Sequence, residues 1–125
     1  PAKKEEKRTI LILARQDGKL LIRRRPSKGL LAGLWEFINL PDTGKAPIAL
    51  LEEENYQPIE IQPLGKVKHI FTHIIWHMNA YYVIINSDND DGTWVSLEEL
   101  TTSYPFPSAY KTYLDQLHQI PRRRL

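Results

Sequence analysis

The chain of 125 residues has the length of a single domain, and its 42% hydrophobic and 26% charged residues are typical of a globular protein and not of a disordered one. Cysteine is absent, which excludes disulfides, a thiol nucleophile, cysteine-ligated zinc and an iron–sulfur cluster held by this chain. No apolar run reaches the ~18 residues of a membrane span, and no signal-peptide pattern occurs, so we expect no membrane partner. The lack of cysteine fits a cytoplasmic protein.

The net charge of +2 is too small to indicate a nucleic-acid binder by itself, but the charge is unevenly distributed. Residues 1–28 carry ten Lys and Arg against three acids, and residues 29–65 carry one against six. Lys66 and Lys68 then precede three of the four histidines. If the fold brings the basic segments together, they will form one basic face suited to phosphate groups.

The domain organisation follows from the same pattern. We expect a flexible basic segment at residues 1–8, one folded domain at 9–119 and a basic tail at 120–125. Because the chain begins with Pro1 and lacks an initiator Met, we expect it to be part of a longer polypeptide.

In the first half of the chain, apolar runs and alternation predict strands over the segments 9–14, 19–25 and 34–38. The first two are joined by Asp17-Gly18, a strong hairpin signal. A helix is expected over Lys45–Glu54, where the first turn tolerates the proline.

In the second half, Pro58–Pro63 predicts a short edge strand at best, because proline cannot donate to a ladder. The stretch Lys66–Asn86 is the longest β-like run, and a turn at Ser87–Gly92 follows it. The remaining expected elements are a short strand at 93–95, a helix opened by a capping box at Ser96 and Glu99, and a last helix over 107–119. The order predicts an α+β domain with a mixed, mostly antiparallel sheet and flanking helices.

Metal ligands are not well supported by these patterns. His69, His73 and His77 recur every four residues, but on a strand such side chains lie roughly 13 Å apart, too far to share one ion. The acids of Glu52–Glu54 are the type of group that holds Mg²⁺ near phosphates, but they also fit a solvated helix end. We therefore expect no metal site.

The segment from His69 to His73 is the most unusual polar cluster. It carries two imidazoles, the Thr72 hydroxyl and the Phe71 ring, and two lysines precede it. Composition alone leaves open a simpler interpretation, in which Phe71 belongs to the core and the histidines are ordinary surface residues.

Two stretches carry a family resemblance. Residues 20–37 read Leu-Leu-Ile-Arg-Arg-Arg-Pro-Ser-Lys-Gly-Leu-Leu-Ala-Gly-Leu-Trp-Glu-Phe, and residues 69–73 read His-Ile-Phe-Thr-His. With the later Trp-Val-Ser-Leu-Glu-Glu-Leu and Tyr-Pro-Phe-Pro runs, they closely resemble the C-terminal domain of the MutY family, adenine DNA glycosylases that act on adenine mispaired with 8-oxoguanine. The resemblance implies a Nudix-like α/β/α sandwich.

The same resemblance implies a division of labour. Base excision, its catalytic residues and a 4Fe–4S cluster would belong to an N-terminal catalytic domain, and this chain would hold no catalytic residue, metal or cofactor. Its partners would be that domain and duplex DNA containing 8-oxoguanine opposite adenine. A monomer in the bacterial cytoplasm, associated with the nucleoid, is expected.

The resemblance also assigns site residues. Thr72 would read the lesion, because a hydroxyl can accept from the N7–H of 8-oxoguanine and donate to its C8 carbonyl. Phe71 would contact or wedge beside the base, and His69 and His73 would donate to phosphate or to the base edge. The expected contacts to the DNA backbone are Lys66, Lys68, Arg23, Arg24 and Arg25.

Two alternatives remain at this point. A Nudix hydrolase of oxidised nucleotides needs an Arg-Glu pair upstream of its Glu-Glu pair, but Ile48 and Ala49 stand there, and Ile38-Asn39-Leu40 replaces Pro-Gly-Gly. A protein-interaction module is the other alternative, for which no residue of the sequence gives evidence.

Overall fold

The computed structural model describes residues 2–86 and 92–121. Within these residues, seven strands form one sheet: β1 (Lys4–Ala14), β2 (Leu20–Arg24), β3 (Trp35–Glu36), β4 (Ile38–Pro41), β5 (Pro58–Ile70), β6 (Ile74–Ile85) and β7 (Thr93–Val95). The helices are α1 (Pro47–Glu53), α2 (Leu97–Ser103), the 3₁₀ turn η1 (Ser108–Tyr110) and α3 (Lys111–Gln119). Within the described residues, no helix is long and apolar enough to span a membrane.

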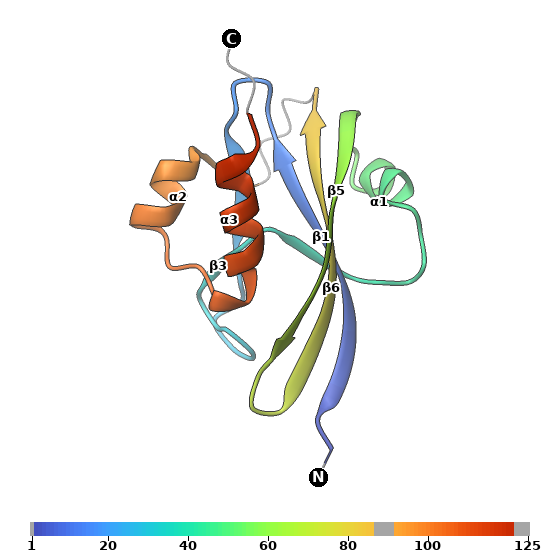
Figure 1. Ribbon diagram of the computed structural model, residues 1–125, viewed down its shortest axis with the longest axis vertical. Helices are drawn as coiled ribbons and strands as arrows, with labels where there is room; N and C mark the ends of the chain where they lie inside the picture. The colour runs from blue at the N-terminus through green and yellow to red at the C-terminus, as the bar shows by residue number, and fades with distance from the viewer. Residues whose placement is uncertain (1, 87–91, 122–125) are drawn as a thin grey trace.

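The sheet is mixed and mostly antiparallel, as predicted. The strand order is β3-β2-β1-β6-β5, with β4 added to β1 and β7 added to β2. Only the β1–β6 pair is parallel among the described strands. In Figure 1, α2 and α3 lie on one side of the sheet and α1 on the other, which confirms the α+β fold with flanking helices.

Alternation along β6 supplies both faces of the sheet to the core. Trp76, Met78 and Ala80 pack in the larger cluster, together with α3, whereas Val83 and Ile85 pack in the smaller one. The α1 side chains in that smaller cluster are Leu50 and Leu51. The two faces of the sheet therefore have separate cores. The same alternation decides on which face each polar side chain of β5 and β6 lies.

The start of β1 differs from the prediction. Residues 4–8, which we expected to be flexible, form the first part of the strand and pair in parallel with Ile74–Met78 of β6. The sequence did not predict this part of the strand because its side chains are charged and mostly exposed, so it has no apolar run. The basic N-terminal residues are therefore held in place beside the β5–β6 hairpin.

The second difference is the length of β5. This strand is at the edge of the sheet, as expected, but it covers 13 residues and not only Pro58–Pro63. Irregularities in its pairing between Pro58 and Glu60, and between Pro63 and Gly65, accommodate the two prolines. The predicted run 66–86 is thus the end of β5 and all of β6, separated by a turn at Phe71–His73.

The remaining elements agree closely with the sequence. The helix expected over 45–54 is α1, and the Ser96–Glu99 capping box is confirmed. The last helix starts as η1 and continues as α3. The strand expected over 34–38 divides into β3 and β4. Most of the predicted Ser87–Gly92 turn and of the basic tail lies outside the described residues.

Tyr113 of α3 fixes the irregular part of β5. Its buried hydroxyl donates to the Gly65 carbonyl at 2.9 Å, and burial raises the pKa of Tyr113 to about 12. An unfolded tyrosine ionises near pH 10, at about its ordinary pKa. Because the pKa of Tyr113 is higher in the folded state, its contribution to the free energy of unfolding is complete below about pH 10 and is lost as the pH rises toward about 12.

We expect Tyr113→Phe to lower the free energy of unfolding by about 1 kcal/mol at neutral pH, through the lost hydrogen bond. The difference between wild type and variant should shrink as the pH rises above about 10. Urea denaturation at a series of pH values measures this. A difference that stays constant into the alkaline range would contradict the assignment.

Candidate nucleic-acid interface

The turn between β5 and β6 presents the predicted lesion-reading residues at one end of the sheet. The Phe71 amide donates to the Ile74 carbonyl at 2.8 Å and closes the turn. Thr72 and His73 are exposed at its tip. The Thr72 hydroxyl therefore lies on the surface, not under the sheet, where it is free to contact a ligand.

The two stretches that carry the family resemblance meet at this tip. An open hollow of about 520 Å³ is lined from one side by Gly29 and Leu30 and from the other by the segment 70–74. The loop on the first side is strained, because Leu31 has a φ of 56°, a value that non-glycine residues adopt rarely. Strained loops of this kind are common beside binding sites, since the surrounding structure must hold them.

Phe71 packs along the edge of the core and does not project freely. Its ring makes edge-to-face contacts with His69, at 4.7 Å between centroids, and with Trp76, at 4.9 Å. The ring is nevertheless half-buried and lines the hollow. The surface of the hollow beside Thr72 is therefore aromatic and apolar.

Two lysines from the segment that we expected to be flexible also reach the turn. Lys3 Nζ donates to the Phe71 carbonyl at 2.8 Å, and the Lys4 amide donates to the His73 carbonyl at 3.0 Å. Their position follows from the parallel β1–β6 pairing, which no local sequence pattern signals. Lys3 adds positive charge beside Thr72, whereas the Lys4 ammonium pairs with Glu6 at 3.4 Å.

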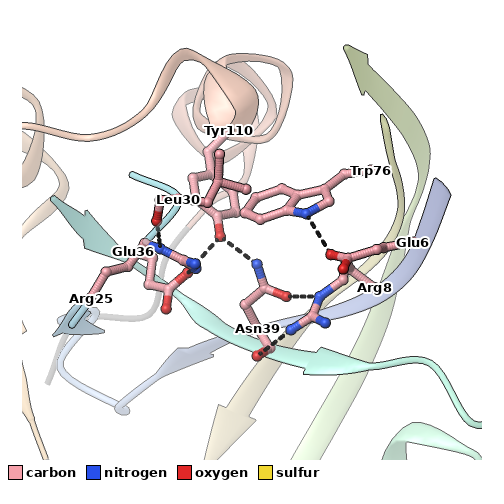
Figure 2. Close-up of polar contacts among 8 residues, drawn as sticks. All are labelled: Glu6, Arg8, Arg25, Leu30, Glu36, Asn39, Trp76 and Tyr110. Atoms are coloured by element: carbon pink, nitrogen blue, oxygen red, sulfur yellow. Dashed lines mark hydrogen bonds and ion pairs between the residues drawn. The ribbon is translucent and has the colours of Figure 1, made fainter. Parts of the chain in front are cut away.

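Arg25 makes its contacts within the chain (Figure 2), and its expected contact with the DNA backbone stays a prediction. Its Nη1 contacts Glu36 Oε1 at 2.7 Å, with the two side chains only 17% and 15% exposed, and its Nε donates to the Leu30 carbonyl at 3.0 Å. The guanidinium also lies over the Trp76 ring at 5.5 Å. Arg25 thus joins the loop on one side of the hollow to the ring that supports Phe71 on the other.

The Arg25–Glu36 pair continues into a chain of hydrogen bonds (Figure 2). The Tyr110 hydroxyl donates to Glu36 Oε1 at 3.0 Å and accepts from Asn39 Nδ2 at 3.0 Å. Arg8 Nε donates to Asn39 Oδ1 at 2.7 Å. Burial, and secondly the Glu36 charge, raise the pKa of Tyr110, so its hydroxyl stays protonated and donates.

Arg23 and Arg24 take different directions. Arg23 Nη2 donates to the Tyr56 hydroxyl at 3.4 Å, and Tyr56 belongs to the core on the α1 side. Arg24 is exposed, and its Nε donates to the Gly33 carbonyl at 3.0 Å. The three consecutive arginines therefore do not form one phosphate-binding group.

Lys66 and Lys68 lie on the opposite face of the sheet from the His69 side chain. The ladder pairs Lys66 with Asn79 and Lys68 with His77, whereas His69 pairs with Trp76 on the α3 side. Directly paired residues share one face. The expected single basic face is therefore divided between the two faces of the β5–β6 hairpin.

The residues do not fit the metal site of a Nudix hydrolase. Glu53 forms an ion pair with Lys45, and Ile48 and Ala49 supply no ligand at their positions of α1. His77 Nε2 contacts Glu5 Oε1 at 2.7 Å. Across residues 2–86 and 92–121, no three His, Asp or Glu side chains are grouped so that they could hold a metal ion.

Residues 9–116 match the NUDIX domain family, so the chain belongs to that family. Within it, the likeness is to the C-terminal domain of MutY-type adenine DNA glycosylases, which confirms the resemblance seen in the sequence. The adenine DNA glycosylase of Schizosaccharomyces pombe is 31% identical over 124 residues, covering 80% of this chain and 27% of that protein. The corresponding protein of Rattus norvegicus is 34% identical over 94 residues, covering 64% of this chain and 18% of that protein.

Solved structures show the same likeness. The C-terminal domain of mouse MUTYH, solved in complex with human PCNA, has a TM-score of 0.71 and 26% identity, covering 93% of this chain and 88% of that one. The MutT Nudix hydrolase of Staphylococcus aureus has a TM-score of 0.67 at 18% identity, covering 94% and 98%, and shows the fold alone. The chain spans about a quarter or less of the length of the curated glycosylases it matches.

Proposed function

We propose that this chain is the lesion-reading domain of an adenine DNA glycosylase in base-excision repair, and that it recognises 8-oxoguanine opposite a mispaired adenine. The observation that carries the proposal is the exposed Thr72 at the tip of the β5–β6 turn, beside a hollow formed by both resembling stretches. The likeness to adenine DNA glycosylases supports it.

The chemistry of the tip suits an oxidised purine. 8-Oxoguanine differs from guanine by an N–H donor at N7 and a carbonyl acceptor at C8, and one hydroxyl can serve both. Guanine offers only an acceptor at N7, so one of the two interactions is lost. Phe71 provides an apolar surface beside Thr72, and Lys3 and His73 would supply donors for the neighbouring phosphates.

In this assignment, the chain itself does not cleave the glycosidic bond. The base-excising groups, and the 4Fe–4S cluster that the resemblance implies, would lie in the glycosylase domain, since this chain has no cysteine to ligate a cluster. The domain would work as a monomer that closes on the lesion strand while the catalytic domain acts on the adenine.

We expect Thr72→Ala in the full-length glycosylase to reduce the preference for 8-oxoguanine:adenine over guanine:adenine by roughly tenfold, as a lost base contact is worth ~1–3 kcal/mol. Single-turnover excision rates on the two duplexes measure the preference. Thr72→Ser keeps the hydroxyl and should retain most of it, and Thr43→Ala, in an exposed turn, is the matched control. Unchanged discrimination in Thr72→Ala would rule out this role.

A Nudix hydrolase remains the competing function because the fold is shared with MutT proteins. The α1 residues argue against it, since Ile48 and Ala49 remove two of the groups that such an enzyme needs. Mg²⁺-dependent hydrolysis of 8-oxo-dGTP by the 125-residue chain would support the hydrolase instead.

A further inference from the structure

A second hollow lies on the other face of the β5–β6 hairpin. It has a volume of about 430 Å³ and is lined mainly by β1, β5, β6 and the turn after β4. The lining residues are Lys7, Asp42, Lys66, Val67, Lys68, His77, Met78 and Asn79. Three of these eight are lysines, so the hollow gathers cations from two strands that are distant in sequence.

The strand register explains how the lysines meet. Lys68 of β5 lies opposite His77 of β6 in the antiparallel ladder, and Lys7 of β1 lies beside His77 in the parallel one. Lys66 precedes Lys68 by two residues on β5, so both side chains lie on the same face. The three ammonium groups therefore belong to one surface that crosses three strands.

Within the described residues, these lysines lack the carboxylate partner that several other surface lysines have. Lys4, Lys45 and Lys111 each have a carboxylate partner within the chain. Lys7, Lys66 and Lys68 have no ion pair within residues 2–86 and 92–121, and all three are exposed.

The acids near the hollow do not balance this charge. Asp42 is the carboxylate in the lining, and its Oδ1 accepts from the Gly44 amide at 2.9 Å. Glu5 Oε1 contacts His77 Nε2 at 2.7 Å and is a second carboxylate near the hollow. The three lysine charges exceed the two carboxylate charges of Asp42 and Glu5, and an anion entering the hollow would balance the excess.

We propose that this hollow binds a phosphodiester group of the DNA backbone, held by Lys7, Lys66 and Lys68. This assignment rests on the proposed function in DNA repair, and it adds Lys7 and a second face of the hairpin to the interface. A free nucleotide fits the lining less well, because His77 is the only ring that the described residues contribute to it, and a base needs a flat partner on which to stack. DNA would then be contacted on both faces of the hairpin, with lesion reading at the tip and phosphate binding behind it.

The test compares two triple variants of the 125-residue chain with the same change in charge. Lys7→Gln/Lys66→Gln/Lys68→Gln removes the cations of the hollow. Lys19→Gln/Lys45→Gln/Lys111→Gln removes three exposed lysines elsewhere. Binding to a fluorescently labelled duplex is measured by anisotropy over about 50–200 mM salt. A folded-state NMR spectrum of each variant confirms that the fold is intact.

We expect the hollow variant to bind the duplex roughly tenfold more weakly than the control variant, with the slope of log affinity against log salt reduced by about 1, the value for one lost phosphate contact. Equal losses in both variants would overturn the phosphodiester site and leave the role of Thr72 untouched. A wild-type chain that binds no duplex would overturn it too, whereas the Thr72 discrimination test in the full-length glycosylase would still decide the proposed function. Binding of dGMP at the hollow as tight as that of the duplex would assign it to free nucleotides instead.

Discussion

Glu36→Ala is expected to lower the free energy of unfolding by about 3 kcal/mol, because breaking a buried ion pair leaves the remaining charge without its partner. Glu36 is the carboxylate for Arg25, and the Tyr110 hydroxyl donates to the same oxygen. Both donors would lose their acceptor in a site with little access to water. Urea denaturation at neutral pH measures the change.

The control is Glu53→Ala, which breaks the exposed ion pair with Lys45 and should cost less than about 1 kcal/mol. The double variant Arg25→Met/Glu36→Leu should be more stable than Glu36→Ala, since it removes the stranded charge as well. If Glu36→Ala costs no more than Glu53→Ala, the pair does not stabilise the loop as inferred.

Trp76→Ala should cost about 4 kcal/mol, the range for deleting a large aromatic side chain from a core. Trp76 is 2% exposed, supports the Phe71 ring at 4.9 Å and lies under the Arg25 guanidinium. Its loss should therefore also loosen the turn that presents Thr72. Denaturation measures the stability, and hydrogen exchange of the Phe71 amide reports the turn, since that amide donates within it.

Trp94→Ala is the matched control for the turn. Trp94 packs in the core on the α1 side and is only partly buried, so its removal should cost less and leave the Phe71 amide protected relative to global unfolding. Equal exchange of that amide in the two tryptophan variants would show that Trp76 does not support the turn locally.

Much of the fold was predictable because its signals are local. Turn chemistry predicts the Asp17-Gly18 hairpin, and the capping box at Ser96 predicts the start of α2. Helical periodicity predicts α3. The missed parts depend on distant partners. Residues 4–8 are a strand because β6 pairs with them, and β5 continues past Pro63 because irregular pairing absorbs the prolines.

The candidate site shows the same division. Thr72 was found because the motif is contiguous, and its exposure agrees with the role we propose. Alternation along a strand places Lys66 and Lys68 on one face and His69 on the other, so their separation could be predicted from the sequence. The position of Lys7 could not, because its neighbours come from the parallel pairing of β1 with a strand 70 positions away. The structural role of Arg25 likewise needed the positions of Glu36 and Trp76.

The two-faced hairpin limits which insertions and deletions the domain can accept. Side chains of β5 alternate between the faces, so one residue added between Val67 and Phe71 would exchange the sides of the residues beyond it. The aromatic support of the turn would then point away from the α3 core. Insertions or deletions of two residues in β5 preserve the alternation. Variants that keep this site should therefore differ in the length of β5 by an even number of residues.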